Sequence, residues 1–209
     1  DLEAGRPDSI TKDKLMVMKH HGVNRISINP QTMNDDTLKL IGRHHTVSQV
    51  KEAFKLARGC GFDNINMDLI IGLPGETEEH IKRTMDEVAA LAPDSLTVHS
   101  LAIKRAANLN IFWEKYKAYS MINTDDIINM TADCASAMGM EPYYLYRQKN
   151  MAGNFENVGY SKPGREGIYN ILIMEEKQTI MAVGAGASTK VVFPEEGSEE
   201  RRVGKECRS

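Results

Sequence analysis

The stretch Asn64-Ile-Asn-Met-Asp-Leu-Ile-Ile-Gly-Leu-Pro-Gly75 decides the fold class of this chain. Within its first eight residues, the apolar Ile65, Met67, Leu69 and Ile71 alternate with the polar Asn64, Asn66 and Asp68, which is the period of a β-strand. A turn at Gly72–Gly75 follows, and apolar residues then recur every three or four positions from Ile81 to Ala92, as on one face of a helix. A strand that leads through a turn into an amphipathic helix is the repeating unit of a parallel α/β fold.

The same unit repeats on both sides of this stretch. Strands are predicted over residues 23–29 and 95–101, and helices over residues 12–21 and around the apolar stripe Val50–Ala57. Glu3 belongs to the end of an earlier strand, and the units repeat every 30 to 40 residues or so, roughly the length of a βαβ element. Because parallel strands need crossover helices, we predict that residues 1–105 form half of an α/β barrel.

The pattern changes after residue 105. Two helices are predicted over Ala107–Met121 and Asp125–Met138, followed by a polar and aromatic stretch, Tyr143–Tyr160. A hairpin is predicted next, with strands over Ile168–Met174 and Thr179–Val183. We interpret residues 106–194 as an appended, mixed α+β region that covers the barrel and its substrate.

Both ends of the sequence are unusual. The chain begins at Asp1 with what reads as the tail of a strand, which suggests that the beginning of that strand is missing. Residues 195–209 are highly charged, and only Val203 and Cys207 are apolar, so no periodic face can be buried. Residues 198–209 also resemble the translation of a sequencing adapter. We therefore expect a fragment of a longer protein with a disordered, non-native tail.

Composition excludes several classes of protein. The 26 basic and 29 acidic residues give a net charge of −3, so no global basic field attracts nucleic acid or an anionic membrane. The longest apolar runs, such as Ile171–Met174, are far too short to span a bilayer. Cys60, Cys134 and Cys207 are too far apart for a disulfide framework or a metal-ligand cluster, which suits a reducing cytoplasm.

Polar residues fall where the predicted parallel strands end. Glu3 ends the first strand, Gln31 closely follows the second, and Asp68 lies late in the third, while Arg43 lies on a short helical segment after the second. Ligands of parallel α/β folds bind at the carboxyl ends of the strands. This set suits a zwitterionic ligand with hydroxyls, because acids bind an ammonium, arginine binds a carboxylate, and Asp and Gln bind a diol. The alternative is that each residue is a satisfied polar group at the mouth of a loop.

Two motifs at the strand ends carry a family resemblance. They are Arg25-Ile-Ser-Ile-Asn-Pro-Gln-Thr-Met-Asn34, followed by Ile41-Gly-Arg43, and Asn66-Met-Asp-Leu-Ile-Ile-Gly-Leu-Pro-Gly75. Over about residues 1–194 the chain resembles the radical SAM oxygen-independent coproporphyrinogen III oxidases. The string Tyr144-Leu-Tyr-Arg-Gln-Lys-Asn150 is similar, within that group, to the HemZ-type coproporphyrinogen dehydrogenases. The resemblance implies that residues 1–105 are the second half of a partial (β/α)6 TIM-like barrel.

The resemblance also implies roles in binding S-adenosylmethionine (SAM). By position, Glu3 would meet the methionyl amine and Arg43 the carboxylate. Gln31 and Asp68 would hold the ribose hydroxyls, and Ala102 would flank the adenine. These roles agree with the chemistry that the side-chain types favour on their own.

The sequence departs from the family in its cysteines. The family signature Cys-x3-Cys-x2-Cys, which holds a 4Fe-4S cluster, is absent from this chain, and none of its three cysteines has the spacing to replace it. The histidine pairs at 20–21 and 44–45 do not indicate a metal site either, because adjacent residues on a helix face apart and no carboxylate follows at ligand spacing.

The substrate that the resemblance implies is coproporphyrinogen III, which carries four propionates. Tyr146, Arg147, Lys149 and Asn150 are candidates to bind it, because cations beside aromatic surface suit such a ligand. The alternative is that the tyrosines of this stretch are core and interface residues.

The implied activity is oxidative decarboxylation of two propionates to vinyl groups, giving protoporphyrinogen IX in heme biosynthesis. SAM and a 4Fe-4S cluster would generate the 5′-deoxyadenosyl radical, and an electron donor and an electron acceptor would complete the reaction. We expect the fragment itself to be inactive. The alternatives are a heme-binding or heme-trafficking protein on the same scaffold, and an α/β-barrel enzyme without a cluster.

Overall fold

A computed structural model describes residues 2–101, 119, 122–146, 156–184, 187–193 and 197–202. The chain divides into two compact units, Asp1–Glu166 and Gly167–Ser209. In chain order, the elements are β1 Leu2–Gly5, the 3₁₀ turn η1 Pro7–Ser9, α1 Lys12–His20, β2 Ile26–Ile28, α2 Asp35–Leu40, α3 Val47–Gly59, β3 Ile65–Ile71, α4 Glu78–Leu91, β4 Ser95–Ser100, α7 Asp125–Ala137, β5 Glu141–Tyr146, β6 Asn157–Ser161, α8 Ile168–Met174, β7 Ser188–Phe193 and β8 Gly197–Arg202.

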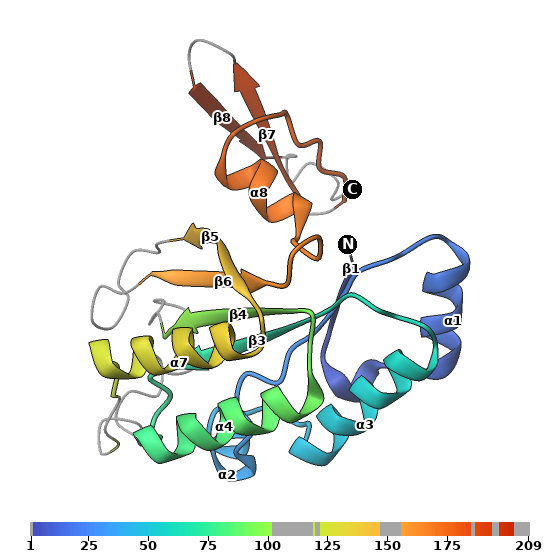
Figure 1. The fold of residues 1–209 in the computed structure, drawn as a ribbon. Helices are drawn as coiled ribbons and strands as arrows, with labels where there is room; N and C mark the ends of the chain where they lie inside the picture. The colour runs from blue at the N-terminus through green and yellow to red at the C-terminus, as the bar shows by residue number, and fades with distance from the viewer. Residues whose placement is uncertain are drawn as a thin grey trace, which may run out of the picture. The chain divides into compact units, whose positions relative to one another are not determined.

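The first unit is built on a six-stranded sheet of order β1-β2-β3-β4-β6-β5 (Figure 1). Strands β1 to β4 run parallel, whereas β6 pairs antiparallel with both β4 and β5. The predicted strand–helix repeat is therefore confirmed as an α/β sheet of the half-barrel kind. Strand β2 is shorter than predicted, because only Ile26–Ile28 form a regular strand, which pairs with β1 over all three residues and with β3 at Ile26 and Ser27.

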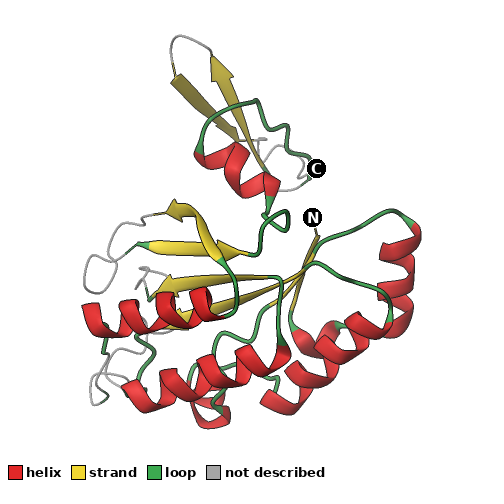
Figure 2. Ribbon diagram, viewed as in Figure 1, coloured by secondary structure: helices red, strands yellow, loops and turns green. Residues whose placement is uncertain are grey.

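Helices α1, α3 and α4 lie on one side of this sheet (Figure 2). The stripes predicted from the sequence face the strands: Val50, Phe54 and Ala57 of α3 are buried, as are Ile81, Met85 and Val88 of α4. They pack against alternate residues of the strands in one apolar core. Among the described residues, no helix is both long enough and apolar enough to cross a membrane.

Local sequence signals explain where the main helices begin. Thr11, Thr46 and Thr124 each occupy the N-cap, and each side chain accepts a hydrogen bond from a backbone N–H of the first turn. At Thr46 the side chain of Gln49 accepts in return from the N-cap N–H, at 2.9 Å, which completes a capping box. The helices predicted at 12–21 and 125–138 are confirmed, whereas the helix predicted over 107–121 lies outside the described residues apart from Tyr119.

The six-stranded sheet continues past residue 105. The stretch Tyr143–Tyr160, which carried no strand prediction, contains most of β5 and β6, and these strands extend the sheet beyond β4. Gly159 of β6 explains their close pairing, because a Cβ at this position would overlap the ring of Tyr144. A strand glycine of this kind gives a neighbouring ring room to lie flat across the backbone.

In the second unit, the first strand of the predicted hairpin is wrong. Ile168–Met174 is helix α8 and not a strand, with the Ile171 N–H bonded to the Gly167 carbonyl and the Glu175 N–H bonded to the Ile171 carbonyl. The run is almost wholly apolar, so it has no period that separates a strand from a helix. Downstream, Ile180 pairs with Lys190 as a single bridge next to β7.

The charged tail also differs in part from the expectation of disorder. Gly197–Arg202 form β8, which pairs antiparallel with β7 over six residues. Backbone pairing of this kind needs no apolar side chains on the added strand, which is why hydrophobic patterning did not predict it. Residues 203–209 lie outside the described residues.

Candidate cofactor-binding site at the strand ends

The face of the sheet that points away from the helices is polar. Ile65, Met67, Leu69 and Ile71 of β3 belong to the apolar core, so the pleat turns the intervening Asn66 and Asp68 to the opposite face. The same alternation places Ser27 of β2 beside Asn66, and Thr97 of β4 beside Asp68. This face is the one that a closed barrel would enclose.

Hydrogen bonds join the polar face across several strands. The Asn66 amide donates to Ser27 Oγ at 2.9 Å and to Asp68 Oδ1 at 2.7 Å. The Thr97 hydroxyl is 3.5 Å from Asn66 Oδ1, and the Tyr144 hydroxyl is 3.4 Å from Thr97 Oγ1. The side chains of β2, β3, β4 and β5 are therefore oriented by one another before any ligand binds.

Asp68 is the acidic group at the centre of this face. Its Oδ2 atom lies 4.0 Å from His99 Nε2, and the side chain of Asp68 is 19% exposed. Burial lowers the pKa of His99 below its ordinary 6.5, although the charge of Asp68 opposes this effect. At neutral pH the imidazole is therefore uncharged, and Asp68 remains available as an acceptor for a hydroxyl group.

Gln31 lies next to Asp68 at the end of the neighbouring strand. The Gln31 N–H donates to the Asp68 carbonyl at 3.0 Å, and the Ile70 N–H donates to the Gln31 carbonyl at 2.8 Å. Gln31 has a φ of 69°, in the left-handed region that non-glycine residues rarely adopt. The structure thus brings together the two residues that the sequence predicts as ribose ligands, and it holds one of them in a strained backbone conformation.

Arg43 lies in a turn rather than on a helical segment. Helix α2 ends at Leu40, and the Arg43 N–H donates to the Leu38 carbonyl at 2.8 Å while its side chain is exposed. Two residues later, the buried ring of His45 donates from Nε2 to the Pro30 carbonyl at 3.2 Å. This bond ties the Arg43 segment to the residue that precedes Gln31.

The remaining predicted residues are described only in part. Glu3 pairs with Ser27 in register, but its side chain lies outside the described part of the structure. Tyr146 ends β5 with a side chain that is 40% exposed. Ala102, Arg147, Lys149 and Asn150 lie outside the described residues.

The donor set fits the ligand that the resemblance implies. Gln31 and Asp68 are joined through their backbones at adjacent strand ends, and Arg43 follows on a segment that His45 bonds to Pro30. These residues supply a carboxylate, an amide and a guanidinium. Ser100 Oγ, at the end of β4, is buried without a hydrogen-bond partner among the described residues, so a polar group can still be accommodated there. These groups match the hydroxyls and the carboxylate of SAM.

The two cysteines that the structure describes do not fit an iron–sulfur cluster. Cys60 caps the end of α3 and Cys134 lies within α7, so they belong to separate helices and not to the strand ends. The described residues contain no group of three or more His, Cys, Asp and Glu side chains that could hold a metal ion. Burial also raises the pKa of the Cys134 thiol, which disfavours the thiolate that a metal needs.

Part of the chain matches a known protein family. Residues 4–88, from β1 to α4, match the Radical SAM superfamily. This segment is therefore a radical SAM domain. The matched segment contains Gln31, Arg43 and Asp68, so the candidate site lies within the radical SAM domain.

The chain is similar both to an oxidase-like protein and to a heme chaperone. It is 50% identical over 196 residues, 94% of this chain, to the oxygen-independent coproporphyrinogen-III oxidase-like protein HemZ of Bacillus subtilis. It is 40% identical over 98 residues, 47% of this chain, to the heme chaperone HemW of the same organism. The chain spans 39% of the length of HemZ and 26% of the length of HemW.

A solved structure supports the fold. The coproporphyrinogen III oxidase HemN of Escherichia coli, a radical SAM enzyme, superposes with a TM-score of 0.65 at 21% identity. The superposition covers 90% of this chain and 43% of HemN. The predicted fold class, a partial TIM-like barrel, is therefore confirmed for the first unit.

Several residues around the site were not predicted from the sequence. Asn66, Thr97, His99 and Tyr144 line the polar face, and the buried Glu76 lies behind it. The signal that could have identified the first three is alternation, because polar residues at every second position of a parallel strand mark a face that no helix covers. No comparable signal marks Glu76, which follows a turn that reads as ordinary loop.

Proposed function

We propose that this chain is part of a SAM-dependent coproporphyrinogen III dehydrogenase, an oxidoreductase of heme biosynthesis. The reaction would convert two propionates of coproporphyrinogen III to vinyl groups and yield protoporphyrinogen IX. The observation that carries the proposal is the junction of Gln31 and Asp68 at adjacent strand ends, where Gln31 N–H bonds to the Asp68 carbonyl at 3.0 Å. The 50% identity to HemZ over 94% of the chain favours this member of the superfamily.

In this proposal the residues at the strand ends bind and orient SAM. Asp68 and Gln31 hold the ribose hydroxyls, Arg43 pairs with the carboxylate, and Glu3 accepts from the amine. Ala102 would flank the adenine. When bound, SAM and a 4Fe-4S cluster supply one-electron chemistry, and this chain supplies position and a site from which water is excluded. The cysteines that hold the cluster would come from a part of the protein other than this chain.

Substrate binding is assigned to the end of β5. Tyr146 is exposed there, and Arg147, Lys149 and Asn150 follow it directly in the sequence. Two cations and an amide that follow an aromatic residue in the sequence suit the propionates of coproporphyrinogen III. An electron donor for the cluster and an electron acceptor would be the further partners.

The experiment uses a hybrid protein in which this chain replaces the matching 196 residues of Bacillus subtilis HemZ. After anaerobic reconstitution, Arg43→Lys and Asp68→Asn are each expected to weaken SAM binding, with iron content unchanged. Lysine lacks the planar fork of arginine, and a lost charge-assisted bond costs about 1.5–3 kcal/mol, or roughly ten- to a hundredfold in affinity.

Matched controls come from the opposite edge of the sheet. Arg165 and Asp63 form an ion pair at 3.1 Å near the amino end of β3, so Arg165→Lys and Asp63→Asn should leave SAM affinity unchanged. SAM affinity at the wild-type level in both site variants would show that Arg43 and Asp68 are structural. The isolated chain is expected to retain no cluster, because its cysteine spacing does not match the family signature.

A heme-trafficking role is the second candidate, favoured by the 40% identity of 98 residues to HemW. The same hybrid separates the two functions. Turnover of coproporphyrinogen III to the divinyl product supports the dehydrogenase. Stoichiometric heme binding without turnover supports trafficking.

A further inference from the structure

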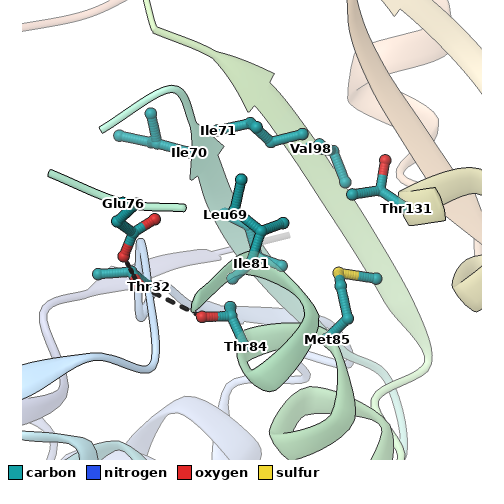
Figure 3. A pocket seen from close by; sticks show the side chains of 10 residues that line it. All are labelled: Thr32, Leu69, Ile70, Ile71, Glu76, Ile81, Thr84, Met85, Val98 and Thr131. Atoms are coloured by element: carbon teal, nitrogen blue, oxygen red, sulfur yellow. Dashed lines mark hydrogen bonds between the residues drawn. The ribbon is translucent and has the colours of Figure 1, made fainter. Parts of the chain in front are cut away.

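A buried carboxylate lies directly behind the candidate site. Glu76, which is 2% exposed, follows the turn after β3. Its Oε1 atom accepts from the Thr32 hydroxyl at 2.6 Å (Figure 3). The same atom also accepts from the Asn34 amide at 2.9 Å. Thr84 of α4 joins the same cluster, with its hydroxyl 3.3 Å from that of Thr32. Glu76, Thr32, Asn34 and Thr84 are called the Glu76 clamp below.

The Glu76 clamp joins two segments that both leave the sheet at the site. Thr32 and Asn34 belong to the segment after β2, and Glu76 to the turn after β3, 44 and 42 positions away. The Met33 N–H also donates to Thr84 Oγ1 at 3.2 Å, so backbone and side chains of the first segment are both held. The segment is thus fixed immediately after Gln31.

Gln31 needs such a restraint. Its φ of 69° is unfavourable for a residue with a side chain, and such conformations persist only when the surroundings over-determine them. Before Gln31 the chain is held by His45, which bonds to the Pro30 carbonyl, and after Gln31 by the Glu76 clamp. Without the clamp, Gln31 can relax to negative φ and break its two backbone bonds with β3.

The cluster is not itself a ligand site. The cavity that Thr32, Glu76 and Thr84 help to line has a volume of about 10 Å³, which is at the lower limit for a single water molecule. Most of its other lining side chains are apolar, among them Leu69, Ile81 and Met85 (Figure 3). The carboxylate therefore faces other parts of the protein and not a bound molecule.

We propose that Glu76 is a positioning residue, whose carboxylate holds the segment after β2 so that Gln31 keeps its left-handed conformation against Asp68. This inference rests on the proposed function, because it explains how the two ribose ligands are kept in register. Glu76 does not touch the cofactor and acts only through Thr32 and Asn34.

The first test measures amide hydrogen exchange in this chain. In Glu76→Ala, exchange at the Gln31 and Ile70 amides is expected to rise at least tenfold, while the amides of α3 and α7 keep their wild-type rates. Glu76→Gln retains an acceptor oxygen at Oε1 and should restore protection to within about threefold. Glu79→Ala removes an exposed carboxylate three positions away, in the first turn of α4, and is the matched control.

Three outcomes would overturn the proposal. They are unchanged exchange at Gln31 and Ile70 in Glu76→Ala, equal acceleration throughout the sheet, and failure of Glu76→Gln to restore protection. If Glu76→Ala does not fold, Thr32→Val removes the shorter bond without exposing or burying a charge, and the same local acceleration is expected.

The second test measures SAM binding in the reconstituted hybrid with HemZ. Glu76→Ala should weaken SAM affinity at least tenfold with normal iron content, and Glu76→Gln should restore it. Wild-type affinity in Glu76→Ala would overturn the positioning role. If the wild-type hybrid binds no SAM, the proposed function fails, whereas the exchange result still decides whether Glu76 holds Gln31.

Discussion

Gly159→Ala tests the part of the sheet that the sequence did not predict. Gly159 pairs with Thr97 of β4 on one side and with Tyr144 of β5 on the other. The Tyr144 ring lies over Gly159, and its hydroxyl reaches Thr97 Oγ1 at 3.4 Å. A methyl group at position 159 would occupy the volume of the ring, so the ring must move and lose this hydrogen bond.

The magnitude follows from three effects. Overpacking typically costs about 1–3 kcal/mol, and the lost hydrogen bond about 0.5–1.5 kcal/mol. Replacing glycine by alanine lowers the conformational entropy of the unfolded chain, which stabilises the folded state by about 0.4–1 kcal/mol. The free energy of unfolding should therefore fall by about 2 kcal/mol.

The assay is urea unfolding followed by circular dichroism, with two companion variants. Gly59→Ala is the control, because no atom lies within 4 Å of a Cβ there and the position ends helix α3. It should be neutral or stabilising by up to about 1 kcal/mol. In the double variant Gly159→Ala/Tyr144→Ala the clash is absent, so the two substitutions should be strongly non-additive. A Gly159→Ala variant within 0.5 kcal/mol or so of wild type, the usual range for surface changes, would refute this placement of Tyr144.

Two further predictions concern pH. Because burial lowers the pKa of His99, the unfolded chain binds that proton more readily, so stability should fall as the pH drops below about 6.5. His99→Gln should flatten the dependence of the unfolding free energy between roughly pH 7.5 and 5.5. Burial raises the pKa of Tyr144 to about 12. The folded protein therefore holds this phenolic proton more tightly than the unfolded chain does. The stability that this difference contributes should be lost as the pH rises from 10 towards 12. Burial also raises the pKa of Tyr160, so absorbance at 295 nm should show one fewer late-titrating tyrosine in Tyr144→Phe than in the wild type. A wild-type curve in that variant would contradict the assignment.

The sequence alone determined the repeating unit of the fold. Alternation over Asn64–Ile71 and the apolar stripe of Ile81–Val88 report which face of each element is buried, and this information is local. It also located Gln31 and Asp68 as neighbours, because carboxyl ends of parallel strands converge on one edge of a sheet. It did not determine α8, because a short, almost uniformly apolar run carries no period.

Only the tertiary structure decided how the site is supported. Glu76 bonds to Thr32 across 44 positions, and Tyr144 lies over Gly159 from the neighbouring strand. Neither contact produces a periodic pattern in the sequence, because each depends on how two elements pack together and not on the residue spacing within one element. Nor does any residue preference mark Gln31 for its left-handed φ, since glutamine rarely adopts it unaided. Local patterns thus specified which residues reach the strand ends, and packing between distant segments specified the conformation in which they are held.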